Sequence, residues 1–416
     1  MNVVTELRAN WVAHDSISTA EGRRSIIRTM VNGHLNTVFV SMPPVGSNYG
    51  EGEADAFLAF LKDAKSAGFV VFGWISNHKR TYPVPADLRL PEEREAQAKW
   101  VEEIIVDYPC LDGIAIDYIR YPTWETSDFE KQEGTTLTVK AIREVTDKAG
   151  VTLLSTSFPA ATVSFRGDQS QWEGAVPEWF QEWYTTNPNN YYQLEASSGG
   201  TGIVNQDNMG GSKPQYLLGP SFMSYQQDPV TWIKNGFVDH VAPMQYTSDP
   251  AVMRNEIDRW EEFTSLIGHP MTGIYLGLGW FDESSSFPDS QFDPAAMVAH
   301  INYGREKGVG GYAIFRMGIP GIDDTPLVEA LTTPNNDNSR TPPFSTNKAS
   351  PFPRSDSTMC EKILVFTSSG ERNTSLDSAS CLASTMVLLV LLRGIYRARM
   401  FRFYDRGWPL CASHDA

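Results

Sequence analysis

Strand-like apolar runs alternate with helix-like stretches eight times between residues 6 and 332 of this 416-residue chain. Continuous apolar runs of this kind indicate strands that are buried on both faces, as in parallel sheets. Several stretches between them begin at a capping residue or Pro and end at Gly, as helices do. The alternation therefore predicts an α/β fold, a (β/α)8 TIM barrel in a domain that covers residues 1–332. The expected strands are 6–13, 36–42, 69–76, 112–117, 151–158, 237–246, 271–281 and 310–317.

The main alternative to a closed barrel is an open, doubly wound sheet, which is built from the same kinds of elements. A G-x-G-x-x-G motif would favour that fold, but none follows the first strand-like run. The chain is also long enough for a barrel of about 250 residues with an appended segment. The barrel is therefore the favoured prediction.

The most informative segment for chemistry is DGIAIDYIRYP, residues 112–122. Its apolar run ends at Asp117, and barrel enzymes place catalytic groups where a strand meets its following loop. Tyr118, Arg120 and Tyr121 follow directly, and an Arg three residues from a carboxylate can hold it ionised and oriented. The alternative is a solvated ion pair at the end of a strand.

Five segments resemble the glycosyl hydrolase-like family 10 proteins, barrel enzymes distantly related to α-amylase and chitinase barrels. In chain order they are ELRANWV, GHLNTVFVSM, LDGIAIDYIRYP, DPVTWIKNGFVDHVAPMQYT and GVGGYAIFRMG, between residues 6 and 318. Several motifs in the family's order are more specific than any single one. The resemblance implies a TIM barrel that hydrolyses O-glycosidic bonds of a polysaccharide or cell-wall glycan.

The same resemblance implies site residues at the positions that match the family's strands. They are Arg8 in the first strand, Asp117, Tyr118, Arg120 and Tyr121 at the fourth, Gln245 and Tyr246 at the sixth, and Arg316 at the eighth. Two departures limit the analogy. Chitinases have a Glu two residues after the last Asp of the fourth strand, where this chain has Ile119. Amylases have an acid at the end of the fifth strand, where this chain reads SFPAATV.

Glycoside hydrolysis usually needs two carboxylates, one to protonate the leaving oxygen and one to attack or to activate water. Asp117 is the predicted nucleophile or base. Asp282 and Glu283, after the seventh strand, and Asp15, after the first, are the candidates for the acid. Acids in such places are more often solvated loop residues or helix caps.

Other polar and aromatic residues at expected strand ends are candidates for substrate binding. Asn77 and His78 end the third strand, Gln245 and Tyr246 the sixth, and Trp280 lies at the end of the seventh. Amide, imidazole and phenol groups can bind sugar hydroxyls, and aromatic rings can stack on sugar faces. The alternative for His78 is an ordinary loop histidine, and the alternative for Gln245 and Tyr246 is a structural role in a hydrogen-bonded barrel rim.

The resemblance implies a carbohydrate partner, whereas the net charge and the missing motifs predict no nucleic-acid partner and no cofactor. The net charge of −16 opposes phosphate binding. The sequence contains no P-loop, H-E-x-x-H or calcium-loop motif, so no metal is expected. The four cysteines lack the spacing of a structural zinc site.

The remaining segments differ in composition from the expected barrel. Residues 160–230 form an aromatic-rich insertion that suits either a sugar platform or a self-packed subdomain. Residues 333–358 are rich in Pro, Ser, Thr and Asn and predict a disordered linker. The tail, 359–416, is interpreted as a weak membrane anchor, a small packed helix or, in preference, a segment with no evolved fold. Its apolar run, 381–392, is short for a membrane span, so membrane contact is not favoured.

The sequence leaves localisation and part of the function open. No secretory signal is visible in MNVVTELRANWV, which predicts a cytoplasmic protein, or an extracellular one if the true start is missing. A non-catalytic carbohydrate-binding barrel is the alternative to a glycosidase, because the second carboxylate is unassigned. A lyase or deacetylase that acts on sugars is a third possibility.

Overall fold

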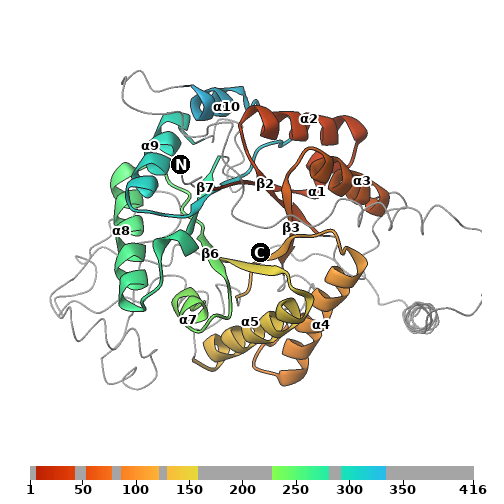
Figure 1. Cartoon of the computed structure of the whole chain (residues 1–416), viewed down its shortest axis with the longest axis vertical. Coiled ribbons are helices and arrows are strands. Elements are labelled where there is room, and N and C mark those ends of the chain that lie inside the picture. The colour runs from red at the N-terminus through yellow and green to blue at the C-terminus, as the bar shows by residue number, and fades with distance from the viewer. Residues whose placement is uncertain are drawn as a thin grey trace, which may run out of the picture. The chain divides into compact units, whose positions relative to one another are not determined.

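The computed structural model describes residues 6–42, 53–76, 86–120, 129–157, 227–280 and 292–333. In these residues, parallel strands lie at the centre and helices surround them (Figure 1). The strands are β1 (Leu7–Val12), β2 (Thr37–Ser41), β3 (Val70–Ser76), β4 (Gly113–Asp117), β5 (Thr152–Ser157), β6 (His240–Pro243), β7 (Tyr275–Gly279) and β8 (Gly311–Phe315). The helices are α1 (His14–Ile17), α2 (Ala20–Asn32), α3 (Glu53–Ser66), α4 (Pro91–Asp107), α5 (Phe129–Ala149), α7 (Pro229–Lys234), α8 (Pro250–Leu266), α9 (Pro294–Glu306) and α10 (Thr325–Thr332), with a 3-10 turn at Met271–Gly273.

The strand order confirms the predicted (β/α)8 barrel. The strands pair in the order β6-β5-β4-β3-β2-β1-β8-β7, and the paired strands are parallel. Two isolated parallel bridges, Val241 to Ile274 and Met244 to Gly277, link the β6 and β7 segments, so the ring is nearly closed. An open, doubly wound sheet has no such closure.

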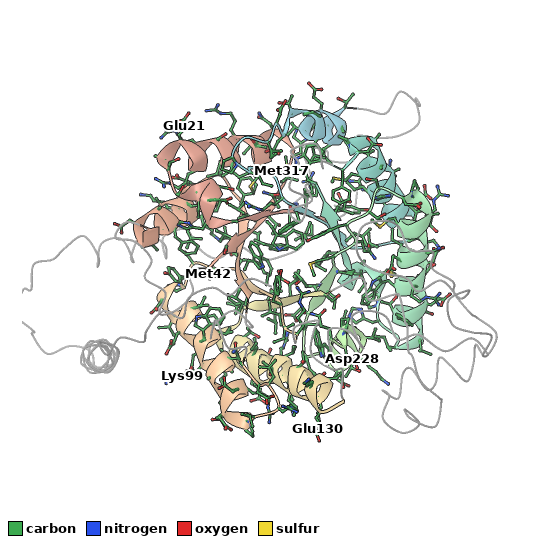
Figure 2. All side chains as sticks on the ribbon, turned by 180° about the vertical axis from the view of Figure 1, so that it is seen from behind. Glu21, Met42, Lys99, Glu130, Asp228 and Met317 are labelled. Carbon is green, nitrogen blue, oxygen red and sulfur yellow. The ribbon has the colours of Figure 1, made fainter. Side chains whose placement is uncertain are left out.

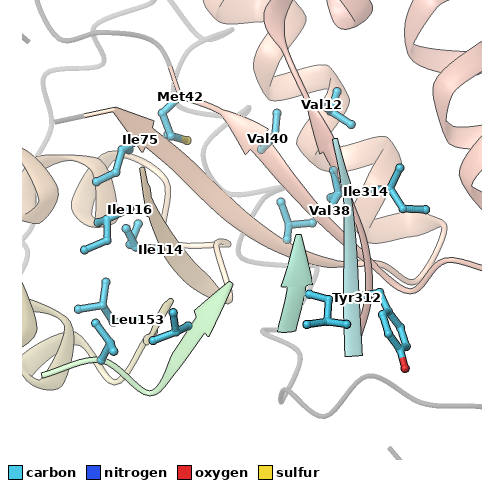
Figure 3. Packing of buried hydrophobic residues seen from close by; sticks show 14 of the residues in the cluster. Val12, Val38, Val40, Met42, Ile75, Ile114, Ile116, Leu153, Tyr312 and Ile314 are labelled. Atoms are coloured by element: carbon cyan, nitrogen blue, oxygen red, sulfur yellow. The ribbon is translucent and has the colours of Figure 1, made fainter. Parts of the chain in front are cut away.

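The continuous apolar strands are explained by two separate layers of core. One set of alternate residues fills the barrel interior, including Trp11, Phe39 and Phe72. The other set packs between the strands and the helices, and Val38 and Ile116 belong to it (Figure 3). Because both faces of each strand are buried, the strand sequences are near-continuous apolar runs and do not alternate between apolar and polar residues.

The helices turn polar faces to solvent and apolar faces to the sheet. Glu21, Lys99 and Glu130 are exposed on α2, α4 and α5, and their side chains lie around the outside of the barrel (Figure 2). Several helix starts use the expected devices. The Thr19 side chain caps α2, and the Asp228 side chain caps α7, which begins with Pro229.

Strand bounds differ from expectation where side chains or turns interrupt the ladder. The sixth strand begins at His240 instead of 237, and Asp239 before it accepts a hydrogen bond from the Leu153 backbone N–H at 2.8 Å. Asp239 also pairs with Arg143 at 2.7 Å, at the amino-terminal end of the barrel. The seventh strand begins at Tyr275 because a 3-10 turn occupies Met271–Gly273.

The expected insertion lies largely, and the linker and tail almost entirely, outside the described residues, which exclude 158–226 and 334–416. Among the described helices, none is long and apolar enough to cross a membrane.

Candidate functional site

Asp117 is the last residue of β4, at the carboxyl-terminal end of the barrel, and only 4% of its surface is exposed. Its carboxylate accepts three hydrogen bonds from groups without charge. The Tyr118 backbone N–H and the Thr156 hydroxyl donate to Oδ1 at 2.6 and 2.7 Å, and the Trp74 indole N–H donates to Oδ2 at 3.1 Å. Trp74 lies on β3 and Thr156 on β5, so both neighbouring strands hold the carboxylate in one orientation.

An aromatic cluster lies next to Asp117, formed by Trp11, Trp74, Tyr246 and Phe315; we call it the aromatic floor. Phe315 is its centre. Tyr246 stacks on Phe315 with ring centroids 5.5 Å apart, and Trp74 and Trp11 meet it edge-on at 6.1 and 5.9 Å. Trp11 is buried, whereas the other three side chains are partly exposed. The aromatic floor can therefore offer apolar ring surface beside a fixed carboxylate.

Arg120 does not form the expected ion pair with Asp117. Its guanidinium carbon lies 3.9 Å from the centroid of the Tyr118 ring, which is a cation–π arrangement. The physical reason is the turn after β4. Tyr118 has a positive φ of 52°, so the chain leaves the strand direction before Arg120. The donors from Tyr118, Thr156 and Trp74, and not the guanidinium, therefore hold the Asp117 carboxylate.

Asp15 and Arg316, both predicted site residues, form a bidentate ion pair between α1, which follows β1, and the residue directly after β8. The two guanidinium nitrogens donate to Asp15 Oδ1 and Oδ2 at 2.8 and 3.0 Å. Burial would raise the pKa of Asp15, but the hydrogen bonds and charge of Arg316 and the bonds from Ser16 lower it. A general acid must hold a proton at working pH, and this environment favours the ionised form of Asp15.

Gln245 and Tyr246 follow β6 at the same end of the barrel as Asp117. The Gln245 backbone N–H donates to the Gly277 carbonyl at 2.7 Å. Its amide group is buried, and within the described part of the chain neither its oxygen nor its nitrogen has a hydrogen-bond partner. Tyr246 belongs to the aromatic floor. The structure thus brings Asp117 and Tyr246 together around the barrel mouth.

Arg8 lies away from this site, contrary to the expectation from the first-strand match. It is the second residue of β1, between Leu7 and Ala9, which face the barrel interior. Alternation therefore turns Arg8 toward the helices, at the amino-terminal end of the strand. Burial lowers the pKa of Arg8, Glu6 opposes this, and Arg305 adds to it.

Trp280 is also unsuited to its expected role in stacking against a ligand. Its side chain is 1% exposed and packs in the core between strands and helices. The indole N–H donates to Asp324 Oδ1 at 2.8 Å. Burial raises the pKa of Asp324, and Asp323 adds to this, while hydrogen bonds from Gly318 and Trp280 oppose it. Trp280 therefore fastens the start of α10 to β7.

Five other predicted site residues lie outside the described residues and remain expectations from the sequence. They are Asn77, His78, Tyr121, Asp282 and Glu283. Across the ranges that the structure describes, no group of three or more His, Cys, Asp or Glu side chains is placed to hold a metal.

The sequence reading did not single out Trp74 and Thr156. Both lie inside expected strands, at interior-facing positions near the end of β4: Trp74 pairs in register with Ala115, and Thr156 follows Ser155, the partner of Ile116. Each residue has a side chain that can donate a hydrogen bond, and each lies one or two residues before the end of a strand. Both strands neighbour the strand of Asp117 in the predicted order. That signal needs the register between strands, which the sequence does not provide.

A scan against protein-family models and a search of curated proteins found no match. Similar solved structures include the C-terminal domain of a putative chitinase from Desulfitobacterium hafniense DCB-2, at 11% identity and a TM-score of 0.47, covering 78% of this chain and 96% of that one. The hyperthermostable endo-1,4-beta-D-mannanase from Thermotoga petrophila RKU-1 has 10% identity and a TM-score of 0.49, with coverage of 75% and 88%. The Bacillus megaterium QM B1551 spore cortex-lytic enzyme SleL has 9% identity and a TM-score of 0.46, with coverage of 79% and 73%. With TM-scores below 0.5, the fold rests on the strand order itself.

Proposed function

We propose that the protein is a glycoside hydrolase, similar to the glycosyl hydrolase-like family 10 enzymes, that cleaves O-glycosidic bonds of a polysaccharide or cell-wall glycan. The observation that carries the proposal is the oriented Asp117 carboxylate at the carboxyl-terminal end of β4, beside the aromatic floor. Barrel enzymes place their chemistry at this end. Aromatic rings offer apolar surface to the carbon-bound hydrogens of a sugar ring.

In this proposal, Asp117 acts as nucleophile or base. An ionised carboxylate on one side of a sugar can attack the anomeric carbon or remove a proton from an attacking water. A second carboxyl group must protonate the leaving oxygen. Asp15 is held as an anion by Arg316, so we assign the acid to Asp282 or Glu283, which follow β7 in the sequence.

A non-catalytic carbohydrate-binding barrel is the second candidate, and a specific observation favours it. Within the described residues, two acids that follow β1 and β8 are already engaged, Asp15 by Arg316 and Asp324 by Trp280 and Gly318. Without a proton donor, the same mouth would bind a glycan and leave its bonds intact.

Turnover by the full chain separates the two candidates. Release of reducing ends would be measured on mannan, chitin oligosaccharides, starch and peptidoglycan, with binding followed by affinity electrophoresis. The informative variant is Asp117→Asn, and the matched control is Asp63→Asn, on an exposed position of α3. Turnover that survives in the control and is lost in Asp117→Asn supports the hydrolase. Binding without turnover by the wild type would establish the carbohydrate-binding barrel instead.

A further inference from the structure

We propose that Trp74 and Thr156 are positioning residues that fix Asp117 so that Oδ2, and not Oδ1, is the oxygen that reacts. The inference rests on the proposed function and adds a specific geometry to it. Neither residue was expected in the site from the sequence.

The two oxygens of Asp117 differ in how many donors they accept. Oδ1 accepts the Tyr118 backbone N–H at 2.6 Å and the Thr156 hydroxyl at 2.7 Å. Among the described residues, Oδ2 accepts one hydrogen bond, from the Trp74 indole N–H at 3.1 Å. A carboxylate oxygen has two lone pairs, so both of those on Oδ1 are occupied and one on Oδ2 remains. Attack on carbon or proton removal needs a lone pair, which assigns the reaction to Oδ2.

Thr156 is suited to hold Oδ1 because its position leaves it little freedom. Its side chain is completely buried on β5, and β-branched side chains have few rotamers. Its hydroxyl lies 2.7 Å from Asp117 Oδ1 and 3.3 Å from the Ile116 carbonyl oxygen. The single hydroxyl proton favours the shorter bond, to the charged acceptor.

Trp74 joins the carboxylate to the surface on which a ligand would rest. Its indole N–H binds Asp117 Oδ2, and its ring meets Phe315 of the aromatic floor. The ring is partly exposed. A sugar that packs on the aromatic floor therefore contacts the side chain that orients the reacting oxygen, so occupation of the floor and alignment of Oδ2 are linked.

A thermal-unfolding cycle tests the geometry without any substrate. The variants are Trp74→Phe, Asp117→Asn and the double variant. An Asn at 117 offers one acceptor oxygen to three donors, so one N–H must face its amide NH2 group. We expect Trp74→Phe to lower the melting temperature by about 3 °C in the wild type and to leave it unchanged or raised in Asp117→Asn. Equal losses in both backgrounds would overturn the proposal.

Kinetics test the role of Thr156. We expect Thr156→Val, which removes the hydroxyl and keeps the shape, to lower kcat about tenfold with KM within about twofold. Thr156→Ser, which restores the hydroxyl, should recover most of kcat. Equal kcat values for the Val and Ser variants would overturn the proposal. A coupled unfolding cycle together with no turnover of any glycan would support the positioning of Asp117 and overturn the hydrolase function, so the two failures are distinct.

Discussion

Buried carboxylates at the two ends of the barrel have different kinds of hydrogen-bond donor, charged at one end and neutral at the other. Asp112 precedes β4 and is held by a cation, because the Lys65 ammonium lies 2.8 Å from both of its oxygens. Asp117 ends the same strand, and its hydrogen-bond donors in the described residues are all neutral. At the amino-terminal end, Glu6 with Arg305 repeats the pattern of Asp112.

The difference separates a carboxylate that suits a stabilising role from one that suits chemistry. A carboxylate whose charge is matched by a buried cation has little reason to react, and its loss leaves an unpaired charge. A carboxylate held only by dipoles keeps its full negative charge for a ligand or a transition state. The placement agrees with the general rule that the carboxyl-terminal face of a barrel carries its chemistry.

The largest expected effect comes from changing the two aspartates in turn. Asp117→Asn should lower kcat by about a thousandfold or more, because a nucleophile or base supplies several kcal/mol of transition-state stabilisation. Asp112→Asn should leave kcat of the folded protein unchanged and lower the free energy of unfolding by about 3 kcal/mol, since it leaves Lys65 buried without its counter-charge. Urea unfolding and turnover of each variant test this. Loss of kcat in Asp112→Asn with normal turnover in Asp117→Asn would contradict the distinction between the two ends.

A smaller effect is expected when the amino-terminal end is titrated. Burial lowers the pKa of His240 from 6.5 to about 4, His269 and Arg143 add to this, and Asp239 opposes it. The unfolded chain therefore binds a proton that the folded chain does not, so this contribution is complete above pH 6.5 and is lost as pH falls toward 4. His240→Gln should reduce the loss in unfolding free energy between pH 7 and 4.5 by about 1–2 kcal/mol. Burial also lowers the pKa of His300 to about 4. The unfolding free energy of the wild type and of the His240→Gln variant should therefore both still fall with pH. Identical slopes would show that His240 does not titrate with unfolding.

The smallest effect is expected at Asp15. Its side chain is 47% exposed in the pair with Arg316, so Asp15→Asn should cost about 0.5–1 kcal/mol of stability. Turnover should change by no more than a few fold, because the pair favours the ionised form and Asp15 is not the assigned acid. A fall of kcat by about a hundredfold or more, with binding intact, would make Asp15 the proton donor.

The sequence predicted the fold well because the barrel buries both faces of its strands, and apolar runs such as GIAID record that burial directly. It also predicted the end of β4 as a place for chemistry, and the structure holds the Asp117 carboxylate there in one orientation. It could not determine the phase of alternation, since all six residues of β1 are buried, so it could not show that Arg8, which the family resemblance implied for the site, points toward the helices. Nor could it show the turn at Tyr118 that carries Arg120 away from Asp117.

Contacts between strands are the other part that the sequence could not supply. Trp74 and Thr156 are ordinary strand residues until the register of β3, β4 and β5 brings them within hydrogen-bond distance of Asp117. Trp280 looks like a ligand-stacking residue until its hydrogen bond to Asp324 is seen. Such pairings depend on tertiary structure, which local composition does not encode.

The joint between β6 and β7 has a consequence for how the molecule moves. Most neighbouring strands are joined by a continuous ladder, but this joint has only two isolated bridges. We expect amide hydrogens along β6 and β7 to exchange with solvent earlier than those of β2 and β3, because local opening needs fewer bonds to break there. Tyr246 lies three residues after the end of β6, so each such opening would also move Tyr246 in the aromatic floor. The fit of the barrel mouth to a bulky glycan would then vary with local opening between β6 and β7.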